Sequence, residues 1–159
     1  MEKILLLEEL TRRLRALREK GHTVALANGV FDLLHVGHLR YLEGAAELAD
    51  VLVVAVNGDE SARRLKGPGR PIIPAAERAE LVAALAAVDF VVLFDDDDVR
   101  AILRKIQPDL HIKGTDYTPE TVPERDVVLA YGGRVAVAGD EKAHATSDII
   151  RRLKGSGNA

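Results

Sequence analysis

The sequence has no cysteine among its 159 residues, which excludes disulfide bonds and thiolate ligands to a metal. Aromatic residues are scarce as well: they make up 4% of the chain, and tryptophan is absent. The hydrophobic content is nevertheless 47%. The core must therefore be aliphatic, built from Val, Leu, Ile and Ala.

Long apolar runs are also missing. No stretch of the sequence approaches the roughly 20 apolar residues that cross a bilayer. The first residues carry charges around a short leucine run, unlike a secretory signal (Glu2, Lys3, Glu8 and Glu9). The formal net charge of -3 indicates no nucleic-acid surface. We therefore expect a cytoplasmic protein with neither a membrane nor a nucleic acid as partner.

Short apolar segments alternate with helical patterns along the whole chain, which predicts an α/β fold with a doubly wound, five-stranded parallel sheet. We expect strands at residues 23–27, 51–56, 90–94, 110–112 and 134–138. We expect helices at residues 4–20, 39–49, 75–87, 98–106 and 149–153, with a short one within 118–133. The length favours a single domain over 1–159, with the first helix inside 1–22 and a frayed tail at 155–159.

The stretch 27–38, with the sequence ANGVFDLLHVGH, connects the first strand to the next helix. Ligands of open α/β sheets bind at the carboxyl ends of strands, and a helix start offers free N–H groups to phosphate. Gly29 and Gly37 let the backbone approach a ligand, and His35 and His38 share one face of the first helical turn. This stretch therefore predicts a site for a nucleoside triphosphate.

Other interpretations of the same residues stay open. The two histidines could be structural at a helix start, or could form a zinc pair, although no third ligand stands near them in the sequence. Asp32 either accepts hydrogen bonds from the backbone of the turn or orients a histidine. Phe31 is expected in the core as well as beside the site.

The pattern Gly29-x-Phe31-Asp32 followed by His35-x-Gly37-His38 resembles the signature of the cytidylyltransferase-like nucleotidyltransferases. Further blocks resemble the branch that makes ADP-heptose from heptose 1-phosphate, and together they span nearly the whole chain (53–59, 65–74, 77–78, 87–94, 108–117 and 146–147). The resemblance implies a Rossmann-like nucleotidyltransferase fold and a homodimer. It also implies Mg²⁺ carried by the triphosphate, with no metal ligand from the protein. Longer bifunctional relatives fuse this unit to a sugar kinase, which we expect to be a separate protein here.

The resemblance also implies roles for individual residues. The catalytic residues are expected to be His35, His38 and Lys66. The nucleotide is expected to contact Asn28, Gly29, Val30, Phe31, Gly37, Lys113, Gly114, Asp116, Thr146 and Ser147. The sugar phosphate is expected to contact Asp32, Asn57, Asp59, Arg70 and Tyr117.

Each of these roles has a plainer alternative. Lys66 can be an ordinary exposed lysine in a Gly/Pro-rich loop, Asp116 and Tyr117 can merely shape their loop, and Thr146 and Ser147 can cap a helix. Ala145 stands where the family usually has a serine, which puts one phosphate contact in doubt.

Two further features have no assigned role in the sequence. Arg78 is either a phosphate ligand or a subunit contact. The acidic run 95–98 is either a metal site or, as we favour, a solvated loop that places acids at the next helix start.

The expected function is transfer of AMP from ATP to D-glycero-D-manno-heptose 1-phosphate, giving ADP-heptose and pyrophosphate. The block 108–117 and the spacing from 65–67 to 70–71 resemble the heptose branch more than the glycerol-phosphate branch. A cytidylyltransferase acting on glycerol 3-phosphate or a similar alcohol phosphate is the rival within this class. A nucleotide-binding sensor without turnover is the rival from another class, against which the histidine pair and Lys66 argue.

Overall fold

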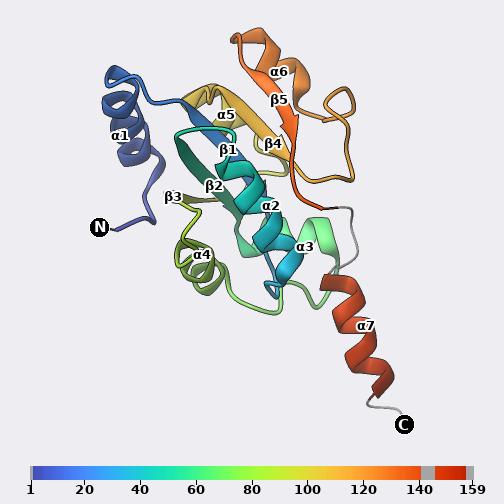
Figure 1. Ribbon diagram of the computed structural model, residues 1–159. Helices are drawn as coiled ribbons and strands as arrows, with labels where there is room; N and C mark the ends of the chain where they lie inside the picture. Colours follow the sequence, from blue (N-terminus) through green and yellow to red (C-terminus); the bar gives the residue numbers. More distant parts are fainter. Residues whose placement is uncertain (1, 141–145, 157–159) are drawn as a thin grey trace.

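Five parallel strands form one sheet in the order β3-β2-β1-β4-β5 in the computed structural model, which describes residues 2–140 and 146–156 (Figure 1). The strands are β1 (Val24–Gly29), β2 (Val51–Asn57), β3 (Phe90–Phe94), β4 (Leu110–Lys113) and β5 (Arg134–Val137). Every residue of β2 is buried, as expected for a parallel strand that is covered on both faces. The predicted α/β class and five-stranded parallel sheet are confirmed.

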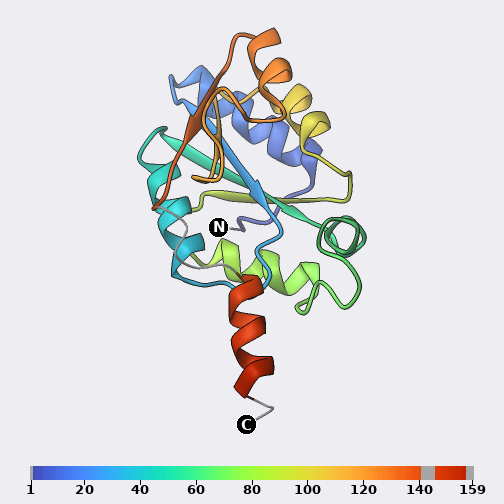
Figure 2. The ribbon, with the colours of Figure 1, turned by 90° about the vertical axis from the view of Figure 1, so that its right-hand side faces the viewer.

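Helices cover both faces of the sheet (Figures 1 and 2). One face packs against α2 (Val36–Ala46) and α4 (Ala75–Ala83). The other packs against α1 (Leu7–Glu19), α5 (Arg100–Ile106) and α6 (Arg125–Ala130). Side chains of a strand alternate between the two faces, so Val53 and Val54 belong to different hydrophobic clusters. Both clusters are mainly aliphatic, as the composition predicts.

The strand order places a switch point between β1 and β4. The chain runs outward from β1 through β2 to β3, then returns to β4 beside β1 and continues outward to β5. The chain therefore leaves β1 toward one side of the sheet and β4 toward the other. In sheets of this kind, ligands bind outside the carboxyl ends of the two strands at the switch point. The stretch 30–38 begins at the carboxyl end of β1.

The first helix is shorter than predicted. It begins at Leu7, because residues 3–5 pair with the edge strand β3: the Leu5 N–H donates to the Val91 carbonyl, and the Val91 N–H donates to the Lys3 carbonyl, both at 2.9 Å. These bonds satisfy the outer backbone groups of an edge strand. At the other end, Gly21 adopts a φ of 88° and closes the helix, as expected.

The sequence interpretation missed the helix α3 (Asp59–Lys66) and expected Lys66 to lie in a loop. The helix has little apolar patterning, because it buries the small residues Ser61 and Ala62 while Leu65 is largely exposed. It ends where Gly67 takes a φ of 97°, which suits glycine. Lys66 is thus the last residue of a helix rather than part of the loop.

Other boundaries also differ from the prediction. β1 extends through Asn28 and Gly29, and the helix predicted at 75–87 ends at Ala83. The last helix, α7 (Thr146–Ser156), begins three residues earlier than expected and extends away from the sheet in both views (Figures 1 and 2). Residues 157–159 of the expected frayed tail lie outside the described part of the chain. Within that part, no helix is long and apolar enough to cross a membrane.

Candidate active site

The start of α2 is capped by the two histidines of the 27–38 stretch. His35 is the N-cap residue, and its Nδ1 accepts a hydrogen bond from the Gly37 N–H at 3.0 Å. The Nδ1 of His38 accepts in return from the His35 N–H at 3.2 Å. The pair forms a reciprocal capping box, with imidazoles in place of the usual hydroxyl and carboxylate.

This capping arrangement fixes where each ring carries its proton. A neutral imidazole has one N–H, and a nitrogen that accepts from a backbone N–H is the unprotonated one. Because both Nδ1 atoms accept, both neutral rings carry the proton on Nε2, at the opposite edge of the ring. The structural role therefore belongs to Nδ1, and the catalytic role expected of the two histidines stays a prediction that concerns Nε2–H.

The two rings stack, with centroids 3.9 Å apart, and Phe31 packs edge-on against His38 at 5.5 Å. The backbone of the turn before His35 is strained, since Phe31 and Leu33 have φ values of 54° and 53°. A Cβ on Gly29 would lie 3.1 Å from the Phe31 ring. Gly29 thus makes room for Phe31, and Phe31 is a core residue that also supports the site. Strain of this kind is characteristic of functional turns.

Asp32 fastens the loop that follows α3. Its buried carboxylate accepts from the backbone N–H of Ile72 at 2.8 Å and of Ile73 at 3.0 Å, and from Nε of Arg70 at 2.9 Å. Burial acts to raise its pKa, but the two backbone N–H groups and the Arg70 guanidinium outweigh it and hold the pKa of Asp32 below its ordinary value. Asp32 therefore bonds backbone, but that of the loop after α3, whereas the sequence interpretation had considered the backbone of its own turn. The substrate contacts expected of Asp32 and Arg70 stay predictions.

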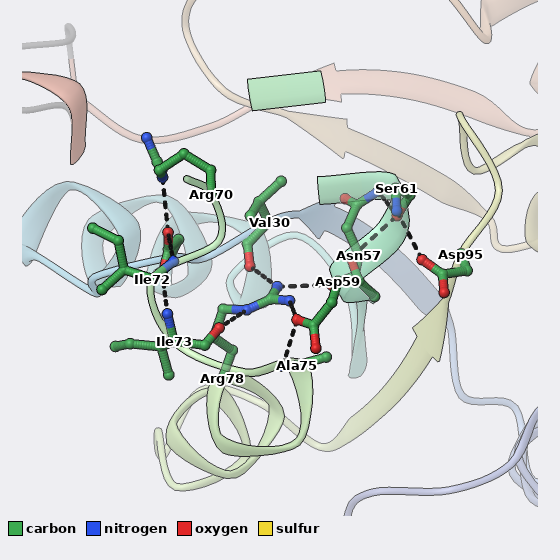
Figure 3. Close-up of polar contacts among 12 residues, drawn as sticks. Val30, Asn57, Asp59, Ser61, Arg70, Ile72, Ile73, Ala75, Arg78 and Asp95 are labelled. Atoms are coloured by element: carbon green, nitrogen blue, oxygen red, sulfur yellow. Dashed lines mark hydrogen bonds and ion pairs between the residues drawn. The ribbon is translucent and has the colours of Figure 1, made fainter. Parts of the chain in front are cut away.

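Arg78 is fully buried, and it joins four chain segments near the carboxyl ends of the inner strands β1 and β2 (Figure 3). Its guanidinium donates to the carbonyls of Val30, Asn57 and Ile73 at 2.6–2.8 Å and to the Asp59 carboxylate at 2.9 Å. Neither role considered for it fits, because a buried guanidinium with these partners faces neither a phosphate nor a second subunit. Arg78 instead ties the carboxyl ends of β1 and β2 to the starts of α3 and α4.

The polar residues after β2 also serve this framework. The Asn57 side chain is buried and donates to Ser61 Oγ at 3.1 Å, while Asp59 Oδ1 accepts from both Arg78 and the Ala75 N–H (Figure 3). The Asp59 side chain is 52% exposed. Asp59 therefore retains a surface for the predicted sugar contact, whereas the Asn57 amide faces the first turn of α3.

The acidic run 95–98 caps helices rather than forming a cluster. Asp95 Oδ1 accepts from the Ser61 N–H at 2.9 Å, and Asp98 Oδ1 accepts from the Arg100 N–H at 3.0 Å at the start of α5. The favoured interpretation, that these acids serve a helix start, is confirmed for Asp98. Residues 2–140 and 146–156 contain no group of three or more His, Asp or Glu that could hold a metal ion.

The end of β4 and the loop after it carry Lys113, Gly114 and Asp116, which are expected at the nucleotide, and Tyr117, which is expected at the sugar phosphate. The ammonium of Lys113 lies 5.1 Å from the centre of the Tyr117 ring, a cation–π contact, and the Tyr117 N–H donates to the Gly114 carbonyl at 3.2 Å. Asp116 is exposed. Lys66, at the end of α3, is exposed as well. The loop is thus ordered by Tyr117 while Asp116 faces solvent.

The start of α7 completes the set of predicted site residues. Thr146 and Ser147 form its first turn, so they open a helix as expected. Ala145 lies outside the described residues. The phosphate contacts predicted for this segment stay predictions.

One polar pair at the site was not singled out from the sequence. His111 of β4 has no exposed surface, and its Nε2 lies 2.9 Å from Oδ1 of Asn28 at the end of β1. A histidine inside an otherwise apolar strand, Leu-His-Ile, was the available signal. The contact joins the two strands that border the switch point.

Comparisons with known proteins identify the family of the chain. The sequence model of the Cytidylyltransferase-like family matches residues 26–153. The chain belongs to the cytidylyltransferase-like family. The resemblance drawn from residues 29–38 is confirmed, and the chain has the Rossmann-like fold of the nucleotidyltransferases.

Relatives extend the match over most of the chain. Bifunctional protein HldE of Syntrophotalea carbinolica is 48% identical over 151 residues, which are 95% of this chain and 31% of that protein. The HldE of Geotalea uraniireducens is 45% identical over 152 residues, 96% of this chain and again 31% of the relative. The chain thus spans under a third of the length of these relatives.

A solved structure shares the fold as well as part of the sequence. The lipopolysaccharide core biosynthesis protein from Thermoplasma volcanium GSS1 superposes with a TM-score of 0.62 at 31% identity. The match covers 74% of this chain and 94% of that one.

The capping geometry predicts that the two functions of His35 can be separated. In His35→Asn the amide oxygen keeps the cap, because asparagine is among the best N-cap residues, but the Nε2–H donor is lost. We expect the free energy of unfolding to change by less than about 1 kcal/mol. We expect kcat to fall by about 10²- to 10³-fold, the usual effect of removing a donor that meets developing charge. Urea denaturation and steady-state kinetics measure the two effects.

His38→Gln is the matched control, since its amide N–H can replace the ring Nε2–H. It should retain more activity than His38→Ala. Near-normal kcat in His35→Asn would contradict the donor role and leave the histidines as caps only.

The lowered pKa of Asp32 predicts a pH-dependent contribution to stability. A carboxylate whose pKa is lowered on folding stabilises the protein above its unfolded pKa, about 4, and the contribution is lost as the pH falls through the folded value. In Asp32→Asn this titration is absent. The difference in unfolding free energy between the wild type and Asp32→Asn should therefore be largest near pH 7 and shrink below pH 4. A difference that stays constant from pH 7 to pH 3 would show that Asp32 does not act through its charge.

Proposed function

We propose that the chain transfers AMP from ATP to D-glycero-D-manno-heptose 1-phosphate, giving ADP-heptose and pyrophosphate. The observation that carries the proposal is the histidine pair at the start of α2, whose capping bonds place the proton of each neutral ring on Nε2, beside the switch point of the sheet. The choice of heptose phosphate is supported by the 45% and 48% identity to proteins named HldE. It is also supported by the 31% identity to a lipopolysaccharide core biosynthesis protein.

In the proposed reaction, an oxygen of the sugar phosphate attacks the α-phosphorus of ATP. The new phosphorus–oxygen bond forms as the bond to the bridging oxygen breaks, and pyrophosphate leaves with the electron pair. The attacking oxygen is already anionic, so alignment of two anions and stabilisation of charge matter more than a general base. His35 and His38 would donate from Nε2 to phosphoryl oxygens, next to the N–H groups of the α2 start.

Lys66 supplies the complementary charge in this proposal. It ends α3, which begins directly after β2, and it is exposed at the start of the loop that Asp32 fastens. An ammonium there can approach the phosphates from the side opposite to α2. Its position on a helix fixes the reach of the side chain better than a loop position would.

A Mg²⁺ ion bound to the triphosphate would neutralise phosphate charge, and such an ion prefers phosphate and water oxygens to a cage of side chains. Among the described residues, no group of three or more His, Asp or Glu could hold a metal ion, and Asp59 and Asp116 are exposed. We also infer a cytoplasmic homodimer, on the family resemblance and the nature of the substrates.

The proposal predicts a preference between nucleotides. With heptose 1-phosphate as acceptor, kcat/KM should be higher with ATP than with CTP, because a site that hydrogen-bonds one base leaves polar groups unpaired with the other. Pyrophosphate release gives the rate, and mass spectrometry of the product identifies ADP-heptose. His35→Asn, for which we expect a strongly reduced kcat, is the matched control in both series.

The contrary results are equally specific. A higher kcat/KM with CTP, or rapid turnover of glycerol 3-phosphate, would assign the chain to alcohol-phosphate cytidylyl transfer. Tight nucleotide binding with no pyrophosphate from any acceptor would instead indicate a sensor.

A further inference from the structure

A buried histidine bridges the two strands that border the switch point. In the register of the sheet His111 lies opposite Leu26, so Asn28, two residues further along β1, belongs to the same face. The ring Nε2 of His111 lies 2.9 Å from the amide oxygen of Asn28. This contact stands at the carboxyl end of β1, directly before the turn that leads to His35.

The chemistry of the pair fixes which atom donates. Burial, and secondarily the positive charge of Lys113, lower the pKa of His111 to about 3, so the ring is neutral at physiological pH. An amide oxygen only accepts, so the single proton of the ring is on Nε2. The other ring nitrogen, Nδ1, is buried and meets no donor among the described residues.

This bond also sets the orientation of Asn28. With its oxygen held by the ring, the amide directs its two N–H bonds the other way. The Asn28 side chain is partly exposed, and residues 2–140 and 146–156 provide no acceptor for its nitrogen. The two amide N–H groups of Asn28 therefore lie at the carboxyl end of β1, next to Gly29 and Val30.

Packing alone does not account for His111. A buried acceptor without a partner costs about 1–3 kcal/mol, and the strand around it is apolar. A leucine would fill this position without an unpaired nitrogen. The histidine is therefore explained by what its Nε2–H does for Asn28.

We propose that His111 is a positioning residue, whose Nε2–H orients the Asn28 amide so that its N–H groups donate to an anionic phosphoryl oxygen of the nucleotide. The inference rests on the proposed nucleotidyl transfer for the identity of the ligand. A rotated amide would present its oxygen to that phosphate, and the oxygen would repel it. Fixing the amide before the ligand arrives avoids this arrangement and its reorganisation.

Three variants test the proposal through the affinity for ATP with Mg²⁺, measured by calorimetry without an acceptor sugar. His111→Gln keeps an N–H near the Nε2 position and should bind ATP within about threefold of the wild type. His111→Leu removes the donor and should weaken binding about tenfold, the equivalent of one hydrogen bond. Its free energy of unfolding should be unchanged or higher, because the unpaired nitrogen is gone.

Asn28→Asp tests the donors without altering His111. The carboxylate still accepts from Nε2–H but offers the phosphate a negative charge in place of two donors, so it should bind ATP at least as weakly as His111→Leu. Wild-type affinity in His111→Leu or in Asn28→Asp would overturn the proposal. Equal losses in His111→Gln and His111→Leu would also overturn it, because the effect would then come from shape.

The affinity test of His111 and Asn28 does not depend on whether the proposed reaction is correct. Parallel titrations with CTP compare the same variants, whichever nucleotide the wild type prefers. Failure of the wild type to use heptose 1-phosphate would contradict the proposed function and leave the affinity comparison intact.

Discussion

The buried guanidinium of Arg78 is the contact on which the geometry of the site depends. It replaces the missing backbone partners of Val30, Asn57 and Ile73, which belong to three segments far apart in the sequence. Asp59 balances its charge from the start of α3. Planar geometry and multiple donors make arginine suited to this task, where a lysine would offer a single point of charge. Because these segments are fixed together, the loop on Asp32 and the start of α2 keep one relative arrangement.

Several polar groups that hold the backbone in place also determine where side-chain protons lie. Nδ1 of His35 and of His38 satisfies backbone N–H groups that a helix start leaves unpaired, and the same bonds determine that Nε2 carries the proton. His111 does the equivalent for the amide of Asn28. In each case a hydrogen bond inside the protein decides which side-chain nitrogen is a donor and where it points. Such preorganised donors lose little energy to rearrangement when charge develops on a phosphate.

The sequence was sufficient where a local pattern has one physical meaning. Apolar runs such as Val51–Asn57 predicted the strands, and the histidine spacing at 35 and 38 predicted a helix start with two rings on one face. The sequence was insufficient where contacts between distant residues determine the local structure. The helix α3 buries only small residues, and its Ser61 N–H donates to Asp95 from the loop after β3. The partners of Arg78, of Asp32 and of His111 lie 19 or more residues away for most of their contacts, so no local signal could reveal them.

The central claim is that capping fixes both histidines with the proton on Nε2, ready to donate to phosphate. The most direct measurement is ¹⁵N NMR of the imidazole nitrogens of His35 and His38, with and without a non-hydrolysable ATP analogue and Mg²⁺. The account predicts unprotonated Nδ1 and protonated Nε2 in the free protein, with the Nε2–H resonances shifting on addition of the nucleotide. Protonation of Nδ1 in either neutral ring, or Nε2–H resonances that ignore the nucleotide, would contradict it.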